Sequence, residues 1–131
     1  MADDSALAVA QRAWDIWMAA DLDAFLELWT EDGVWTNQGS SQISGPRRGR
    51  EEIAFVARTA FEVSGGTLKA RPIALADAGD GVVLGWIHLE AQRDGASLDQ
   101  DGLQRFVIRD GTIASLDNLF TNLPEFDAFY A

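Results

Sequence analysis

Three long strands in the last fifty residues constrain the fold of this chain more than any other feature. Leu98–Arg109 and Thr112–Phe120 alternate with the period of two that is typical of β-strands. Gly81–Arg93 has the same period, but both of its faces begin apolar, so both are expected to be at least partly covered. The short segments Arg93-Asp94-Gly95 and Asp110-Gly111 have the composition of tight turns. The sequence therefore predicts that its C-terminal end is an antiparallel sheet.

Helical patterns precede this sheet. Apolar residues recur at helical spacing over Ser5–Ala20 and Leu22–Leu28, and a third helix is expected to begin near Gly49 and to end at Ser64-Gly65-Gly66. The tail Pro124–Tyr130 carries three aromatic residues and is expected to pack back on the body as a short helical turn. Helices followed by strands predict an α+β fold.

The middle of the chain has weaker patterns. Val34–Asn37 and Thr67–Ala76 are expected to be two further strands, and Glu31-Asp32-Gly33 a turn. Gln38–Arg48 contains Gly, Ser and Pro without periodicity, so a loop is expected there. A few helices cannot cover a curved sheet evenly, and this order of elements therefore favours a pocket for a small molecule.

Length, charge and composition narrow the classes of function. A chain of 131 residues fits one domain spanning residues 1–131. The net charge of −11 disfavours nucleic-acid and anionic-membrane partners, and cysteine is absent, which excludes thiolate chemistry. No apolar run is long enough to span a membrane, and the N-terminus lacks a signal-peptide pattern, so a cytoplasmic protein is expected.

Several short motifs together resemble one known family. They are Asp21-Leu22-Asp23-Ala24-Phe25, Leu28–Trp35, Gly49–Ile53, Arg109–Ile113 and Asp127-Ala128-Phe129. In this order they resemble the SnoaL-like polyketide cyclases and ketosteroid isomerases of the nuclear transport factor 2-like superfamily. The resemblance implies a cystatin-like cone, in which a strongly bent, mainly antiparallel sheet wraps round a long N-terminal helix and a deep apolar pocket. Many members are dimers, so a homodimer is expected, with the partner covering the second face of the sheet.

The resemblance also places the site residues, and they depart from the chemistry of the family. Positions that hold acids in ketosteroid isomerases and epoxide-hydrolase-like members fall on Asn37, Gln104, Leu89 and Asn118. The implied wall of the pocket consists of Trp14, Trp17, Trp35, Asn37, Ile87, Leu89, Gln104, Leu116, Asn118 and Phe120. Such a wall suits an apolar ring compound whose carbonyl or hydroxyl groups bond to amides. Alternatively, the amides satisfy one another or the backbone of a loop.

Charged candidates are few. By alternation Asp101 points away from the pocket, but a bulge at Gly102 would turn it inward and make it the catalytic base. His88, the only histidine, shares a face with Glu90 and is interpreted as an interface or surface pair. Neither a metal site nor a cofactor is expected.

Two functions remain open from the sequence. The first is a pocket protein for a small apolar ligand, with isomerase, cyclase or dehydratase activity that relies on orientation and neutral hydrogen bonds. The second is a non-catalytic binding or interaction module.

Overall fold

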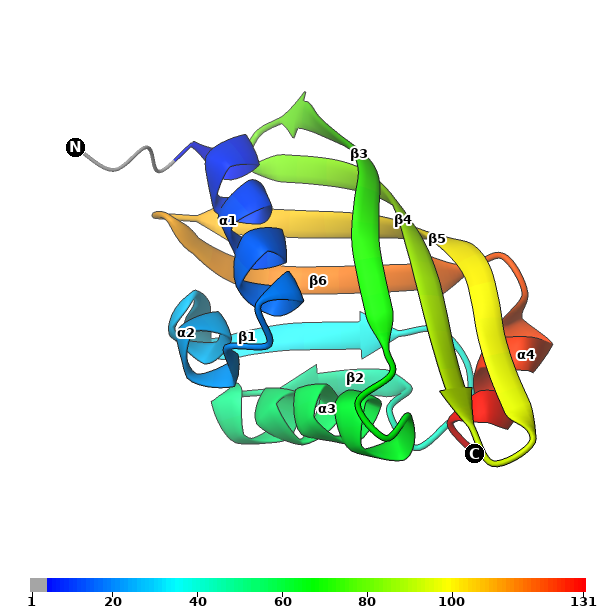
Figure 1. Ribbon diagram of the computed structural model, residues 1–131. Coiled ribbons are helices and arrows are strands. Elements are labelled where there is room, and N and C mark those ends of the chain that lie inside the picture. Colours follow the sequence, from blue (N-terminus) through cyan, green and yellow to red (C-terminus); the bar gives the residue numbers. More distant parts are fainter. Residues whose placement is uncertain (1–4) are drawn as a thin grey trace.

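One curved sheet encloses a layer of helices in the computed structural model, which describes residues 5–131 (Figure 1). The helices are α1 (Ala6–Met18), α2 (Leu22–Glu27), α3 (Arg50–Val63) and α4 (Leu123–Phe129). The strands are β1 (Trp29–Asn37), β2 (Gly45–Arg48), β3 (Lys69–Gly79), β4 (Val82–Arg93), β5 (Ala96–Arg109) and β6 (Thr112–Phe120).

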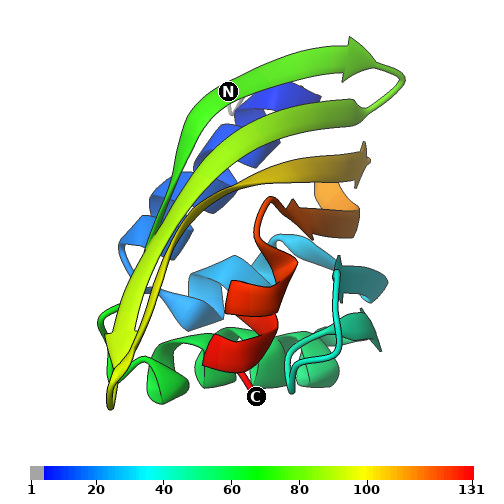
Figure 2. The same ribbon diagram turned by 90° about the vertical axis from the view of Figure 1, so that its right-hand side faces the viewer.

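The sheet has the strand order β2-β1-β6-β5-β4-β3. β1 and β6 form the parallel pair, and the other neighbours are antiparallel. The two edges of the sheet do not meet, and the long strands curve over the helices (Figure 2). This bent, mainly antiparallel sheet around helices confirms the predicted α+β, cystatin-like fold.

Side-chain caps fix the start of three helices. Ser5 accepts a hydrogen bond from the backbone N–H of Ala8, and Asp21 accepts one from Ala24. Asn122 does the same for α4. Each cap satisfies a backbone donor that the first turn of a helix leaves unpaired. α1, α2 and α4 therefore begin where short polar side chains occur in the sequence.

Buried side chains from all layers form one core between the helices and the concave face of the sheet. Trp29, Ile53 and Val83 lie in this core and are fully buried. The C-terminal tail closes one end, because Phe126 stacks on Phe120 with ring centroids 3.7 Å apart. The hydroxyl of Tyr130 donates to the carbonyl of Ala60 on α3.

Two sequence expectations in the middle of the chain were wrong. β1 begins at Trp29, and the expected turn at residues 31–33 is an irregular part of this strand, where its register with β6 shifts. The expected loop ends in an edge strand, β2, which pairs with β1 from Val34 to Asn37. Gly-Pro-Arg-Arg carries no alternation, so only this pairing identifies it as a strand.

None of the helices within residues 5–131 combines the length and the apolar character needed to cross a membrane.

Candidate functional site

A buried cavity of about 70 Å³ lies between the concave face of the sheet and the helices. It is lined by all ten residues that the sequence places in the pocket wall: Trp14, Trp17, Trp35, Asn37, Ile87, Leu89, Gln104, Leu116, Asn118 and Phe120. Alternation along a strand puts every second side chain on one face, which is why residues from β1, β4, β5 and β6 converge here. That these residues bind a ligand stays a prediction.

The three amides of this wall form a continuous row of hydrogen bonds. The indole N–H of Trp14 donates to Gln104 Oε1 over 2.8 Å. Gln104 Nε2 donates to Asn118 Oδ1 over 3.1 Å, and Asn118 Nδ2 donates to Asn37 Oδ1 over 2.9 Å. Strand register creates the row, because Gln104 lies opposite Asn118 and Asn118 lies beside Asn37.

The row ends at a backbone carbonyl. Asn37 Nδ2 donates to the carbonyl oxygen of Ile43 over 3.0 Å, and Asn37 Oδ1 also accepts the indole N–H of Trp35 over 3.1 Å. All three amides are less than 10 % exposed. Each has found a partner within the protein, as buried polar groups need, so the alternative that the amides satisfy one another holds for these bonds.

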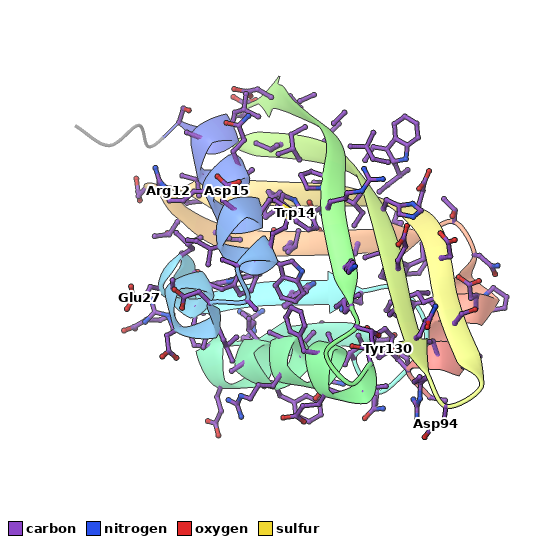
Figure 3. All side chains as sticks on the ribbon, viewed as in Figure 1. Arg12, Trp14, Asp15, Glu27, Asp94 and Tyr130 are labelled. Carbon is purple, nitrogen blue, oxygen red and sulfur yellow. The ribbon has the colours of Figure 1, made fainter. Side chains whose placement is uncertain are left out.

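The lining is uncharged. Among the described residues that line the cavity, Tyr130 is the one with an ionisable side chain, and burial raises the pKa of its phenol above the ordinary value of 10.0. Its hydroxyl is held by the Ala60 carbonyl. Figure 3 shows Trp14 on the side of α1 turned toward the sheet and Tyr130 near the C-terminus. A neutral wall of this kind offers hydrogen bonds but no general base at neutral pH.

Trp17 lines both this cavity and a larger groove on the surface. The groove, of about 290 Å³, is lined by residues that include Phe61, Arg71, His88 and Glu90, and it shares Trp17, Leu68 and Ala70 with the cavity. Trp17 packs on Phe61 with a centroid distance of 4.9 Å. Movement of this indole would therefore join the two spaces.

The expected role of Asp101 as a base has no geometric support. β4 and β5 pair in unbroken register from Val82 to Arg93, so the bulge expected at Gly102 is absent. Gly102 serves close packing instead, because a Cβ there would lie 2.9 Å from the carbonyl oxygen of Leu119. Asp101 stays on the outer face of the sheet, directly opposite His88.

His88 and Asp101 belong to a polar cluster on this outer face. His88 Nδ1 lies 2.6 Å from Asp101 Oδ1, and Trp86 Nε1 donates to Asp101 Oδ2 over 3.0 Å. His88 Nε2 lies 3.0 Å from both Glu90 Oε1 and Asp99 Oδ1. The sequence indicated the His88–Glu90 pair, whereas the two aspartates are added by the pairing of β4 with β5.

A cation could fit among the ligand atoms of His88, Glu90 and Asp99, which lie within 4.8 Å of one another. A proton on His88 Nε2 satisfies the same two carboxylates, and both acids are exposed to solvent. This arrangement by itself therefore assigns no metal to the cluster.

The charges of this cluster predict how the stability of the protein depends on pH. The hydrogen bond to Asp101 raises the pKa of His88 above 6.5, and the bond from His88 lowers the pKa of Asp101 below 3.8. The stabilisation from protonated His88 is present below pH 6.5 and is lost as the pH rises through the raised pKa. The stabilisation from ionised Asp101 is lost as the pH falls through its lowered value.

Replacing Asp101 by asparagine should therefore lower the pKa of His88. Because the chain has one histidine, its imidazole signals can be followed by NMR without assignment, in the presence of a chelator. Asp117→Asn, which breaks the exposed pair with Arg105 instead, is the control. An unchanged titration of His88 in Asp101→Asn would contradict the prediction.

Several lining residues were not predicted from the sequence. Phe25, Val56, Ala60 and Ile43 line the cavity from α2, α3 and the segment before β2. The apolar spacing of Phe25, Val56 and Ala60 indicated only that they are buried, and Ile43 lies in a segment without periodicity. The carbonyl of Ile43 carries no signal in the sequence, since its role depends on the path of the backbone after β1.

Comparison with known proteins identifies relatives of this chain. A family model described as a SnoaL-like domain matches residues 10–116. No curated protein matches the sequence.

Solved structures have the same fold over nearly the whole chain. Bal32a, from a soil-derived mobile gene cassette, is 26 % identical with a TM-score of 0.92, and the match covers 98 % of this chain and 100 % of Bal32a. A Xanthomonas campestris protein with a cystatin-like fold is 24 % identical with a TM-score of 0.90, covering 97 % and 98 %. TerC, co-crystallised with polyporic acid, is 16 % identical with a TM-score of 0.82, covering 97 % and 99 %.

Proposed function

Because this chain belongs to the SnoaL-like domain family, we propose that its buried cavity binds a small, apolar ring compound. The single observation that carries the proposal is the lining, in which aromatic and aliphatic side chains surround a row of three neutral amides. Apolar walls with a few fixed polar groups are the usual composition of small-molecule sites.

Any reaction in this cavity would rely on orientation and on neutral hydrogen bonds. No carboxylate, imidazole or guanidinium group lines it within residues 5–131. Isomerase, cyclase or dehydratase chemistry in the cavity as it stands would then need a base from the substrate or from a water molecule, whereas His88 and Glu90 line the adjoining groove. The absence of charge at the wall favours ligand binding as the primary function. Isomerase, cyclase or dehydratase activity would be a second function of the same cavity.

The size of the cavity implies that Trp17 moves when a ligand enters. An apolar cavity of about 150 Å³ accepts benzene, and the cavity here is about 70 Å³. Since Trp17 also lines the surface groove, its displacement would add volume to the cavity. If the cavity must enlarge before a ring compound enters, the apparent affinity falls in proportion to the fraction of molecules that have the enlarged cavity.

This proposal predicts that Trp17→Leu binds ring compounds more tightly than the wild type, by about tenfold, because less opening is required. Thermal shift and calorimetric titration with steroid-like, terpenoid and polyaromatic compounds, including polyporic acid, would measure the effect. Phe55→Leu, at an exposed position of α3 outside the cavity, is the control. Failure of every compound to bind to either protein would contradict the proposed function.

We also propose that the chain forms the homodimer expected from the sequence, through the outer face of β4, β5 and β6. The exposed side chains of Trp86, Leu103 and Leu119 make a contiguous apolar row there, because Trp86 pairs with Leu103 and Leu103 pairs with Leu119. Exposed apolar patches on soluble proteins commonly mark interaction sites. A second copy of the chain would bury this row.

Leu103→Glu should weaken that dimer by a hundredfold or more, since a buried, unpaired charge costs about 3 kcal/mol or more. Analytical ultracentrifugation over a range of concentrations measures the change. Met18→Glu, a similarly exposed apolar residue at the end of α1, is the matched control. A wild-type protein that is monomeric at every concentration would contradict the proposed dimer.

The cytoplasmic location stays a prediction.

A further inference from the structure

The hydrogen bonds of the amide row can run in only one direction, because the groups at its two ends allow no other. An indole N–H can only donate, so Gln104 must turn its oxygen toward Trp14. At the other end the Ile43 carbonyl can only accept, and Trp35 can only donate, so Asn37 must turn its nitrogen to Ile43 and its oxygen to Trp35. The amide between them must then accept from Gln104 and donate to Asn37.

This orientation leaves one hydrogen on the nitrogen of each lining amide without a partner in the row. A primary amide nitrogen carries two hydrogens, and the nitrogens of Gln104, Asn118 and Asn37 each donate one within the row. Each of the three amide oxygens already accepts at least one hydrogen bond. A buried N–H without a partner is rarer in proteins than a carbonyl with a free lone pair.

We propose that the cavity selects ring compounds that present a hydrogen-bond acceptor, such as a carbonyl or quinone oxygen, over compounds that present a donor. This inference rests on the proposed function, since it assumes that the ligand occupies this cavity. The acceptor oxygen lies against the row, where the second hydrogens of the amide nitrogens meet it, and the rings contact the apolar wall.

The row cannot reverse its direction to follow a different ligand, because Trp14 and Ile43 fix both ends. The ligand class would therefore be set by the protein rather than by adaptation of the amides.

Three compounds of nearly equal shape test the inference. The ligand 1-indanone presents an acceptor, indole presents a donor, and indane presents neither. Calorimetric titration of the full-length protein should give 1-indanone an affinity about tenfold higher than those of indole and indane, the value of one additional hydrogen bond. Equal affinities for the three, or a preference for indole, would overturn the inference and leave the proposed function intact. Failure of all three to bind would overturn both.

A variant tests whether the amide row causes the preference for 1-indanone. Gln104→Met removes an amide while keeping the length of the side chain, and should reduce the preference for 1-indanone over indane to less than threefold. Gln100→Met is the matched control, because Gln100 is also buried but bonds to Asn122 and Glu125 outside the cavity. An unchanged preference in Gln104→Met would overturn the role of the row.

An infrared measurement on the wild type tests the same inference and does not depend on whether a variant folds. Hydrogen bonds from amide N–H groups lower the stretching frequency of the 1-indanone carbonyl, so the infrared band of the bound ligand should lie below its position in an alkane solvent. A band at the alkane position would show that no donor meets the carbonyl and would overturn the inference.

Discussion

Replacing Asn118 by leucine should lower the free energy of unfolding by about 3 kcal/mol, because it breaks two buried hydrogen bonds and leaves the nitrogen of Gln104 without a partner. Leucine has a similar shape, so the loss comes from the bonds rather than from a cavity. Asn37 is affected less, since its oxygen keeps the hydrogen bond from Trp35. Chemical denaturation with a two-state fit measures the change.

Asn122→Leu is the matched control for this prediction. Asn122 is exposed and caps α4 by accepting the N–H of Glu125, and loss of such a cap costs about 1 kcal/mol. The double variant Asn118→Leu with Gln104→Leu should lose less stability than the two single variants added together. In the double variant neither side chain leaves a polar group of the other one unpaired. Equal costs at positions 118 and 122, together with additive single variants, would contradict a coupled row.

The strands and the pocket wall could be predicted because each depends on local alternation. Ile87 and Leu89 share a face of β4 by parity, as do Leu116 and Asn118 on β6, and no knowledge of partner strands is required. Tryptophans at helical spacing on α1 pointed to the same side for a similar reason. The ten residues predicted for the pocket wall therefore followed from the sequence and the resemblance together.

Relations between distant strands could not be predicted in the same way. The amide row needs the parallel pairing of Asn37 with Asn118, two residues 81 positions apart. Asp99 and Asp101 reach His88 only through the register of β4 with β5. A glycine inside a strand can indicate either a bulge or close packing, and at Gly102 the structure shows close packing.

The second large effect concerns the tail that closes the cavity. Gly39 has φ +109°, and a Cβ at this position would overlap Asp127 Oδ1 and lie 2.8 Å from Leu123 Cδ1. Asp127 cannot turn away freely, because its carboxylate accepts both the backbone N–H and the hydroxyl of Ser40. Gly39→Ala should therefore cost at least about 3 kcal/mol, combining backbone strain with a steric clash.

Gly45→Ala separates the two contributions. Gly45 has φ +82°, but a Cβ there would meet nothing within 4 Å, so only backbone strain of about 1 kcal/mol is expected. Thermal and chemical unfolding of both variants measure the difference. Because α4 carries Phe126, which lines the cavity, Gly39→Ala should also weaken ligand binding, whereas Gly45→Ala should not. Equal losses of stability in the two variants would mean that α4 moves away without cost, and that the contact between Ser40 and Asp127 does not hold the tail against the cavity.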